Sequence, residues 1–169
     1  MLICQQSTCK HTAVSLTSSS PRYPALLQLL RTAENLWNTS RIFFDRWEIS
    51  PSQFNILNLL YLNPNGLTQV ELSRELIMHR SNVTGLVDRL EDRGLLLRKD
   101  SSTDRRAYKV VLTATGRRLI EKILPDYYEA AEKIWGNFPV ARTKQLVGDL
   151  KKLSANIELF SQTQLKQKS

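Results

Sequence analysis

The stretch from Thr68 to Leu112 constrains the fold more than any other part of this sequence, because the spacing of its apolar residues changes along it. Up to Arg93 the apolar side chains recur every three or four residues, which is the period of an amphipathic helix. After Gly94 come two short segments rich in apolar and β-branched residues, 95–99 and 108–112, with a polar stretch between them. This order predicts short helices followed by a β-hairpin.

Local signals indicate where these short helices begin and end. Thr68 and Glu71 form a capping-box pattern, in which each residue satisfies a free backbone N–H of the other, so a helix is expected to open there. A break near residues 77–79 separates it from a second helix, which runs from Arg80 to about Arg93 and ends at Gly94. Two short helices, a tight turn and a hairpin predict a winged helix-turn-helix.

Longer helices are expected on both sides of this lobe. A helical stripe of apolar residues follows Pro24, and Ser50 caps a helix over 51–62. Thr113 caps a helix that runs to about Trp135, bent at Pro125, and a last helix follows from Pro139 to about Phe160. The predicted class is therefore mainly α (α+β), with a winged helix-turn-helix lobe and a helical dimerisation part built from N- and C-terminal helices.

The same signals divide the chain into parts. Residues 1–21 are rich in Ser and Thr and are expected to form a flexible tail, and residues 161–169 a polar tail. Residues 22–160 are expected to form one domain, in which 50–112 is the winged lobe. Residues 22–49 and 113–160 are expected to be the dimerisation helices, because a long helix with an apolar stripe usually packs against something large, here a second subunit.

The distribution of charge favours nucleic acid as a partner. The formal net charge is +8 at pH 7 and the isoelectric point is about 9.7, values common among proteins that meet a polyanion. The Arg80–Arg93 helix is on the order of 20 Å long and fits lengthwise in a major groove. Its outward residues near the start are small or polar, as the reading of base edges requires. These could also be ordinary solvated residues at a helix start.

Basic residues also concentrate on the predicted hairpin; they are Arg98, Lys99, Arg105, Arg106 and Lys109. A charged loop tip is usually only solvated. Beside a reading helix, however, an arginine there can enter the minor groove, where the negative potential is enhanced. Asp104 lies two residues before Arg106 and can hold its guanidinium in one orientation.

Other classes of function have little support. The only histidines are His11 and His79, no cysteine lies beyond Cys9, and no phosphate loop or catalytic triad pattern appears, so an enzyme is not expected. Cys4, Cys9 and His11 match no standard zinc spacing, and no metal or cofactor is expected. No stretch reaches the ~18 apolar residues of a membrane span, and the apolar start is too short for a signal peptide, so a cytoplasmic protein is expected.

Three segments together resemble the MarR family of bacterial transcription regulators. The wing string "DRRAYKVVLTATG" begins at Asp104, the segment "LTQVELSRELIMHRSNVTGLVDRLEDRGLLLR" begins at Leu67, and "SPSQFNILNLL" begins at Ser50. The resemblance extends from about Leu26 to Phe160. It implies a homodimer with interleaved terminal helices that binds palindromic promoter DNA, in most cases as a repressor released by a small, often phenolic, anionic ligand.

By position, the resemblance assigns base or groove contacts to the Arg80–Thr84 turn and a minor-groove contact to Arg106, anchored by Asp104. The predicted DNA-binding residues are Thr68, Gln69, His79, Arg80, Ser81, Asn82, Thr84, Arg89, Asp104, Arg105, Arg106 and Lys109. The chain departs from the family pattern at Gly85, where a longer, often basic residue is usual, and at His79, where Ser or Pro is commoner. One base or phosphate contact is therefore expected to be missing.

A ligand pocket is the least supported part of this interpretation. The candidate lining residues are aromatic side chains on helices that would border it, namely Trp37, Phe44, Trp47, Phe54 and Tyr128. Aromatic stripes at helical spacing more often belong to a core or a dimer interface. Two alternative functions also stay open: a redox-responsive regulator that uses Cys4 and Cys9, and a winged helix that binds another protein.

Overall fold

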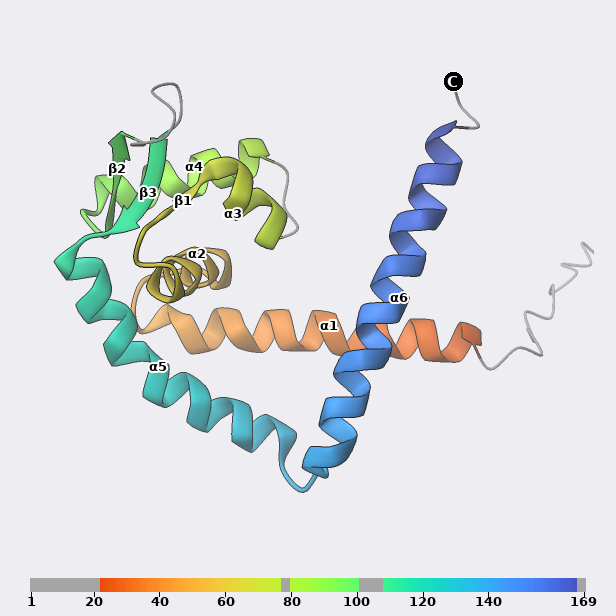
Figure 1. Cartoon of the computed structure of the whole chain (residues 1–169). Helices are drawn as coiled ribbons and strands as arrows, with labels where there is room; N and C mark the ends of the chain where they lie inside the picture. Colours follow the sequence, from red (N-terminus) through yellow and green to blue (C-terminus); the bar gives the residue numbers. More distant parts are fainter. Residues whose placement is uncertain (1–21, 77–79, 101–107, 167–169) are drawn as a thin grey trace, which may run out of the picture.

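The computed structural model describes residues 22–76, 80–100 and 108–166 (Figure 1). It is mainly helical with a small antiparallel sheet, which confirms the predicted class. The elements are α1 (Arg22–Asp45), α2 (Pro51–Leu62), β1 (Leu67–Thr68), α3 (Gln69–Glu75), α4 (Arg80–Asp92), β2 (Leu96–Asp100), β3 (Tyr108–Leu112), α5 (Ala114–Trp135) and α6 (Val140–Lys166).

The predicted caps begin the helices where they were expected. The side chain of Ser50 accepts a hydrogen bond from the Gln53 backbone N–H and starts α2, with Pro51 as the first helical residue. Thr68 caps α3, and Thr113 caps α5. The helix α5 continues through Pro125 to Trp135.

The hydrophobic core lies inside the lobe formed by α2, α3, α4 and the sheet, and it extends to the neighbouring ends of α1 and α5. Its side chains are buried almost completely; the largest are Phe44, Phe54, Ile56, Leu57, Leu60, Leu72, Leu90, Leu96, Ile120 and Ile123. Phe44 and Phe54 stack with their ring centroids 4.4 Å apart and join α1 to α2. The lobe therefore has a complete core within one chain.

The sheet has three strands in the order β1–β3–β2, and the first of them is absent from the sequence-based expectation. Leu67 pairs with Val110 and Thr68 with Lys109, so the two residues before α3 join the hairpin. Gly66 has φ +77°, and a Cβ there would lie 2.7 Å from the carbonyl oxygen of Val110. A segment of two residues is too short to show an alternating pattern, so only tertiary pairing identifies this strand.

A close contact joins the sheet to α5. The hydroxyl of Thr113 donates to the carbonyl of Gly94 (2.7 Å) and accepts a hydrogen bond from the backbone N–H of Gly116 (3.0 Å). A Cβ on Gly116 would lie 1.8 Å from the carbonyl oxygen of Leu95, so any side chain there would force the helix away. These two residues fix the direction in which α5 leaves the lobe.

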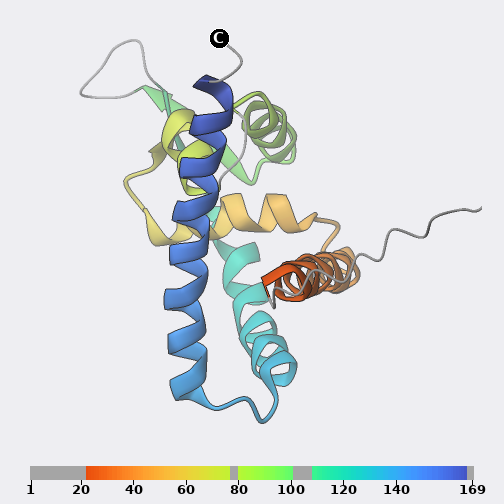
Figure 2. The ribbon, with the colours of Figure 1, turned by 90° about the vertical axis from the view of Figure 1, so that its right-hand side faces the viewer.

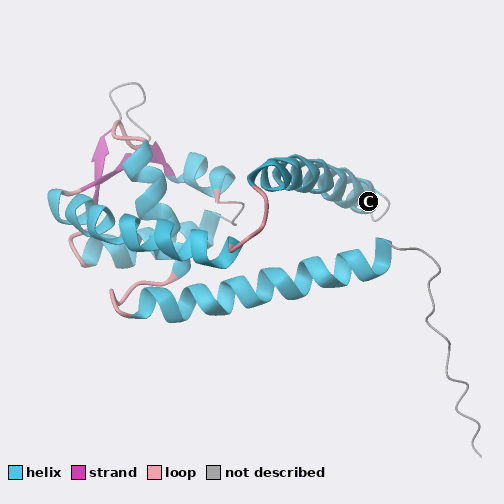
Figure 3. Ribbon diagram, turned by 90° about the horizontal axis from the view of Figure 1, so that it is seen from below, coloured by secondary structure: helices cyan, strands magenta, loops and turns pink. Residues whose placement is uncertain are grey.

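The helices α1, α5 and α6 form arms that extend beyond the lobe (Figures 1 and 2). Figure 3 shows α1 and α6 reaching outward on the same side of it. The sequence predicts an end of the last helix near Phe160, but α6 continues to Lys166. Polarity alone does not end a helix: the segment SQTQLK contains no Gly or Pro, and Gln, Leu and Lys are good helix formers.

Candidate nucleic-acid interface

Helix α4 has one face in the core and the opposite face open to solvent. Val83, Val87 and Leu90 are fully buried at 0% exposure, whereas Ser81, Asn82 and Arg89 are exposed. We call Ser81, Asn82, Gly85 and Arg89 the reading face of α4. The burial of Val83, Val87 and Leu90 is the one predicted from the sequence, because residues three and four apart share one side of a helix.

A hydrogen bond fixes α3 against α4. The hydroxyl of Thr84 donates to the side-chain oxygen of Gln69 at 3.0 Å, so the first residue of α3 contacts the middle of α4. Both residues belong to the predicted DNA-binding set. The bond sets the angle at which the two helices of the helix-turn-helix meet.

The capping box of α3 is fully formed beside this contact. The backbone N–H of Thr68 donates to the Glu71 carboxylate at 2.7 Å, its hydroxyl donates at 2.9 Å, and the Glu71 N–H donates back at 3.2 Å. These hydrogen bonds, above all the one from the Thr68 backbone, hold the pKa of Glu71 below its ordinary value, and Lys109 lowers it further. Thr68 therefore fixes the start of α3, and its hydroxyl already donates one hydrogen bond to Glu71 and accepts another from it.

Arg98 has a different role from the other basic residues of the hairpin. Its guanidinium forms ion pairs with Asp88 and Glu91 of α4, and its backbone N–H donates to Glu91 at 3.0 Å. The bond to Asp88 is the main reason why the pKa of Arg98 lies above its ordinary value. Arg98 therefore fixes the wing to α4, and charge counting along the sequence cannot detect this role, because its partners lie in a different element.

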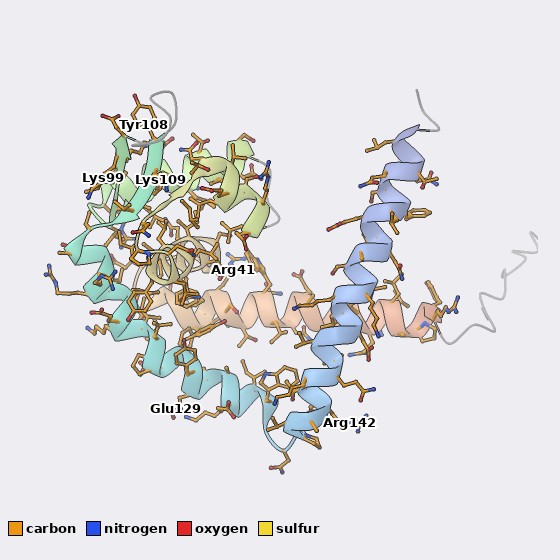
Figure 4. All side chains as sticks on the ribbon, viewed as in Figure 1. Arg41, Lys99, Tyr108, Lys109, Glu129 and Arg142 are labelled. Carbon is orange, nitrogen blue, oxygen red and sulfur yellow. The ribbon has the colours of Figure 1, made fainter. Side chains whose placement is uncertain are left out.

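Two lysines face each other across the hairpin. Lys99 of β2 and Lys109 of β3 are register partners, so their side chains leave the same face of the sheet, and Thr68 of β1 is next in that row. Like charges directly opposite each other destabilise a sheet, and a bound phosphate would offset that repulsion. Figure 4 shows Lys99, Tyr108 and Lys109 at the same end of the molecule as α3 and α4.

The strand pairing brings Thr68 beside Lys109, and a hydrogen bond brings Gln69 beside Thr84. Ser81, Asn82 and Arg89 are exposed on α4. The predicted residues His79, Asp104, Arg105 and Arg106 lie outside the described residues. Arg80 is placed as the first residue of α4.

The five aromatic residues predicted to line a ligand pocket lie in the core, between α1 and α2, and on the arms. Phe44 and Phe54 lie in the core, at 2% and 1% exposure, and Trp47 lies under the guanidinium of Arg46, 3.8 Å from its ring centroid. Trp37 and Tyr128 lie on the arms and are 44% and 60% exposed. Helical spacing shows that such residues share a side but not what that side meets.

A cleft of about 570 Å³ lies instead between α1, α5 and the start of α6. Its lining residues are Thr32, Leu36, Thr39, Ser40, Phe43, Tyr127, Ala130, Ala131, Ile134, Trp135, Phe138 and Leu146, none of which is charged. The hydroxyls of Thr32 and Ser40 donate to carbonyls of their own helix. The surface of the cleft is therefore mainly apolar and aromatic.

Comparison with known proteins decides the family. A family model described as the MarR family matches residues 47–107. The transcriptional regulator FarR of Neisseria gonorrhoeae is 30% identical over 128 residues, which cover 74% of this chain and 87% of the relative. The chain belongs to the MarR family. It is thus a DNA-binding transcription regulator of the winged helix-turn-helix type. Members of this family are transcription regulators rather than enzymes.

Solved structures show the same MarR fold. The chain superposes on the Staphylococcus aureus MepR–DNA complex with a TM-score of 0.73 and 19% identity, covering 82% of this chain and 99% of the other. CouR of Rhodococcus jostii bound to p-coumaroyl-CoA gives a TM-score of 0.73 at 22% identity, covering 80% and 95%. The described elements therefore have the arrangement of MarR proteins.

Two further findings concern the described residues. None of the helices in this part of the chain is long and apolar enough to cross a membrane. Within residues 22–76, 80–100 and 108–166, no group of three or more His, Cys, Asp or Glu side chains is placed to hold a metal ion.

Proposed function

We propose that this MarR protein is a repressor that binds palindromic promoter DNA as a homodimer and is released by a small effector. The observation that carries the proposal is the state of α4. Its apolar face is buried, Gln69 and Arg98 fix it from one side, and its polar reading face is left open. A helix held rigidly with exposed polar side chains is suited to the major groove.

The arms support the homodimer. They expose many large apolar side chains, among them Leu30 at 59%, Ile42 at 80%, Ile157 at 52% and Phe160 at 65%. Exposed apolar surface of this extent usually marks a protein interface. We assign a second copy of the chain to it, because the lobe that the arms carry reads one half-site, and two lobes related by a two-fold axis read a palindrome.

Operator binding tests this function. Duplexes selected from the source genome should be bound by a dimer, with half-sites about one helical turn apart. The affinity should fall steeply as salt rises, since each phosphate contact releases counterions. A protein-interaction module would show neither behaviour. A monomer at micromolar concentration by light scattering would contradict the proposal.

A substitution at Arg106 tests the minor-groove contact predicted for the wing. Arg106→Ala should weaken operator binding by about 1–3 kcal/mol with the fold intact, because it removes the predicted minor-groove contact. Arg142→Ala is the matched control, since Arg142 lies at the opposite end of the molecule (Figure 4). Equal affinities of the Arg106 variant and the wild type would remove the minor-groove assignment.

We place the effector in the cleft between α1, α5 and α6. Its volume of about 570 Å³ falls within the range of small-molecule sites. Its uncharged, aromatic lining favours an apolar aromatic compound over a small anion. The fold neighbour CouR, solved with p-coumaroyl-CoA, is a precedent for an effector with a phenolic group.

A substitution that fills the cleft tests this assignment. Ala131→Phe should place a ring inside the cleft, so aromatic compounds that release the wild-type protein from its operator should no longer do so. Ala114→Phe makes the same change at an exposed position of the same helix and should leave release unchanged. Release of both variants by the same compounds would place the effector elsewhere.

A regulator of promoters acts where the chromosome lies, so we propose the cytoplasm as its location. The redox alternative depends on Cys4 and Cys9, which lie outside the described residues. It predicts that oxidant changes operator affinity and that a Cys4→Ser, Cys9→Ser variant does not respond. No feature of the described residues favours it over release by an effector.

A further inference from the structure

Arg89 and Gly85 stand in an unusual relation on the reading face. A Cβ placed on Gly85 would meet a single neighbouring group within 4 Å, the Nη1 atom of Arg89, at 3.8 Å. Side chains on a helix lean toward its N-terminus, and Arg89 follows Gly85 by one turn. The guanidinium of Arg89 therefore lies back along the helix, beside the position where another residue would carry its side chain.

This placement changes what Arg89 can reach. Its Cα lies on the flank of the exposed side of α4, but the guanidinium is carried toward the middle of that side, near the first turns of the helix. A guanidinium in that position faces the centre of the surface that enters the groove.

Arg89 also differs from the nearby Arg98 in its partners. Arg98 forms ion pairs with Asp88 and Glu91. For Arg89, the part of the chain that the structure describes shows neither a hydrogen bond nor an ion pair, and its side chain is exposed. Its five donors are therefore not used within the described fold.

We propose that Arg89, laid back over Gly85, reads a guanine in the major groove and supplies the contact that the glycine itself cannot make. The inference rests on the proposed function, because it requires operator DNA on the reading face. A guanidinium bound to O6 and N7 of guanine is the commonest specific contact in that groove. Gly85 acts as a positioning residue, since it leaves the space that the guanidinium occupies.

The experiment measures binding of the full-length chain to its selected operator, to the same operator with each guanine replaced in turn, and to a scrambled duplex. Arg89→Ala should lower operator affinity by about 10- to 100-fold and remove the preference for guanine at one position of each half-site. Scrambled DNA should be bound nearly as well as by the wild type.

Two variants at Gly85 separate the positioning role from a general effect. Gly85→Ala adds a Cβ 3.8 Å from the Nη1 atom of Arg89, an ordinary contact distance, so the guanidinium stays in place and the preference for guanine should be kept. Gly85→Leu should displace the guanidinium and reproduce the loss seen for Arg89→Ala. The double variant Gly85→Leu, Arg89→Ala should be no weaker than Arg89→Ala alone. Thermal unfolding checks each fold, and both Gly85 variants are expected to be stabilised.

Several results would overturn the inference while the proposed function stands. One is an Arg89→Ala variant that loses the same factor on operator and scrambled DNA, with a salt slope reduced by about one, which is the behaviour of a phosphate contact. Another is a double variant in which the losses add, which would mean that the side chain introduced by Gly85→Leu itself collides with DNA. If the wild-type protein binds no duplex selectively, both the inference and the proposed function fail.

Discussion

The winged lobe buries its large apolar side chains within one chain, whereas the helical arms leave many of theirs exposed. In the lobe, Leu57, Leu72 and Leu90 are completely buried within one chain. On the arms, Ile42 and Phe160 leave 80% and 65% of their surface exposed. The lobe therefore reaches a complete fold by itself, whereas the arms leave apolar surface that a second chain would cover. This contrast separates the part proposed to read DNA from the part proposed to assemble the dimer.

The largest effect is expected from a charge on the apolar stripe of α6. Leu150→Asp places a carboxylate among Leu146, Leu153 and Ile157 and should prevent dimerisation. Because two linked lobes gain avidity, a monomer should lose about 10²–10⁴-fold in operator affinity. Sedimentation and operator titration would measure both effects.

The control for this variant introduces the same charge on the opposite side of the same helix. Ala155 is exposed and lies on the side of α6 opposite the stripe, so Ala155→Asp is this control. It should leave dimer and affinity unchanged. If the two variants behave alike, the stripe is not the interface and the contrast between lobe and arms fails.

The next largest effect is expected from two glycines, Gly116 beside the lobe and Gly148 on α6. Gly116→Ala places a Cβ 1.8 Å from the carbonyl oxygen of Leu95 in the lobe, so it should destabilise the protein by about 2–3 kcal/mol. Gly148→Ala on α6 meets no atom within 4 Å and should instead stabilise it by about 1 kcal/mol through helix propensity.

Denaturant unfolding of both glycine variants measures the difference. A large loss at Gly148 would show that α6 is already packed closely at that position. No loss at Gly116 would show that α5 can move away from the sheet without cost.

The smallest effect concerns the capping box of α3. Glu71→Ala removes the acceptor for two donors of Thr68 and should lower stability by about 1 kcal/mol. Since the folded pKa of Glu71 is lowered, its carboxylate stabilises the fold above the ordinary glutamate pKa, and this contribution is lost as pH falls through the lowered value. The wild type and the variant should therefore converge in stability toward acid pH. A constant difference between them at every pH would contradict this role.

The candidate site was predictable wherever one element carries the information. The sequence predicted which side of α4 faces the core, because helical periodicity alone separates Val83 and Val87 from Ser81. It did not predict that Arg98 pairs with Asp88 and Glu91, because that contact joins a strand to a helix. The same limit applies to Phe44 and Phe54: the stripe is visible, but the surface against which it packs is not.

The sequence by itself determined the helix caps, the change from helical to strand spacing, and hence the winged helix-turn-helix. These depend on hydrogen bonds and periodicities within a few residues of the chain. The tertiary structure decided the strand Leu67–Thr68 and the path of the Arg89 side chain over Gly85. It also decided the ion pairs through which Arg98 fixes β2 to α4. The strand and the ion pairs of Arg98 join segments that are distant in the sequence, and the path of a side chain depends on the space that its neighbours leave. The residue pattern within one segment therefore cannot specify them.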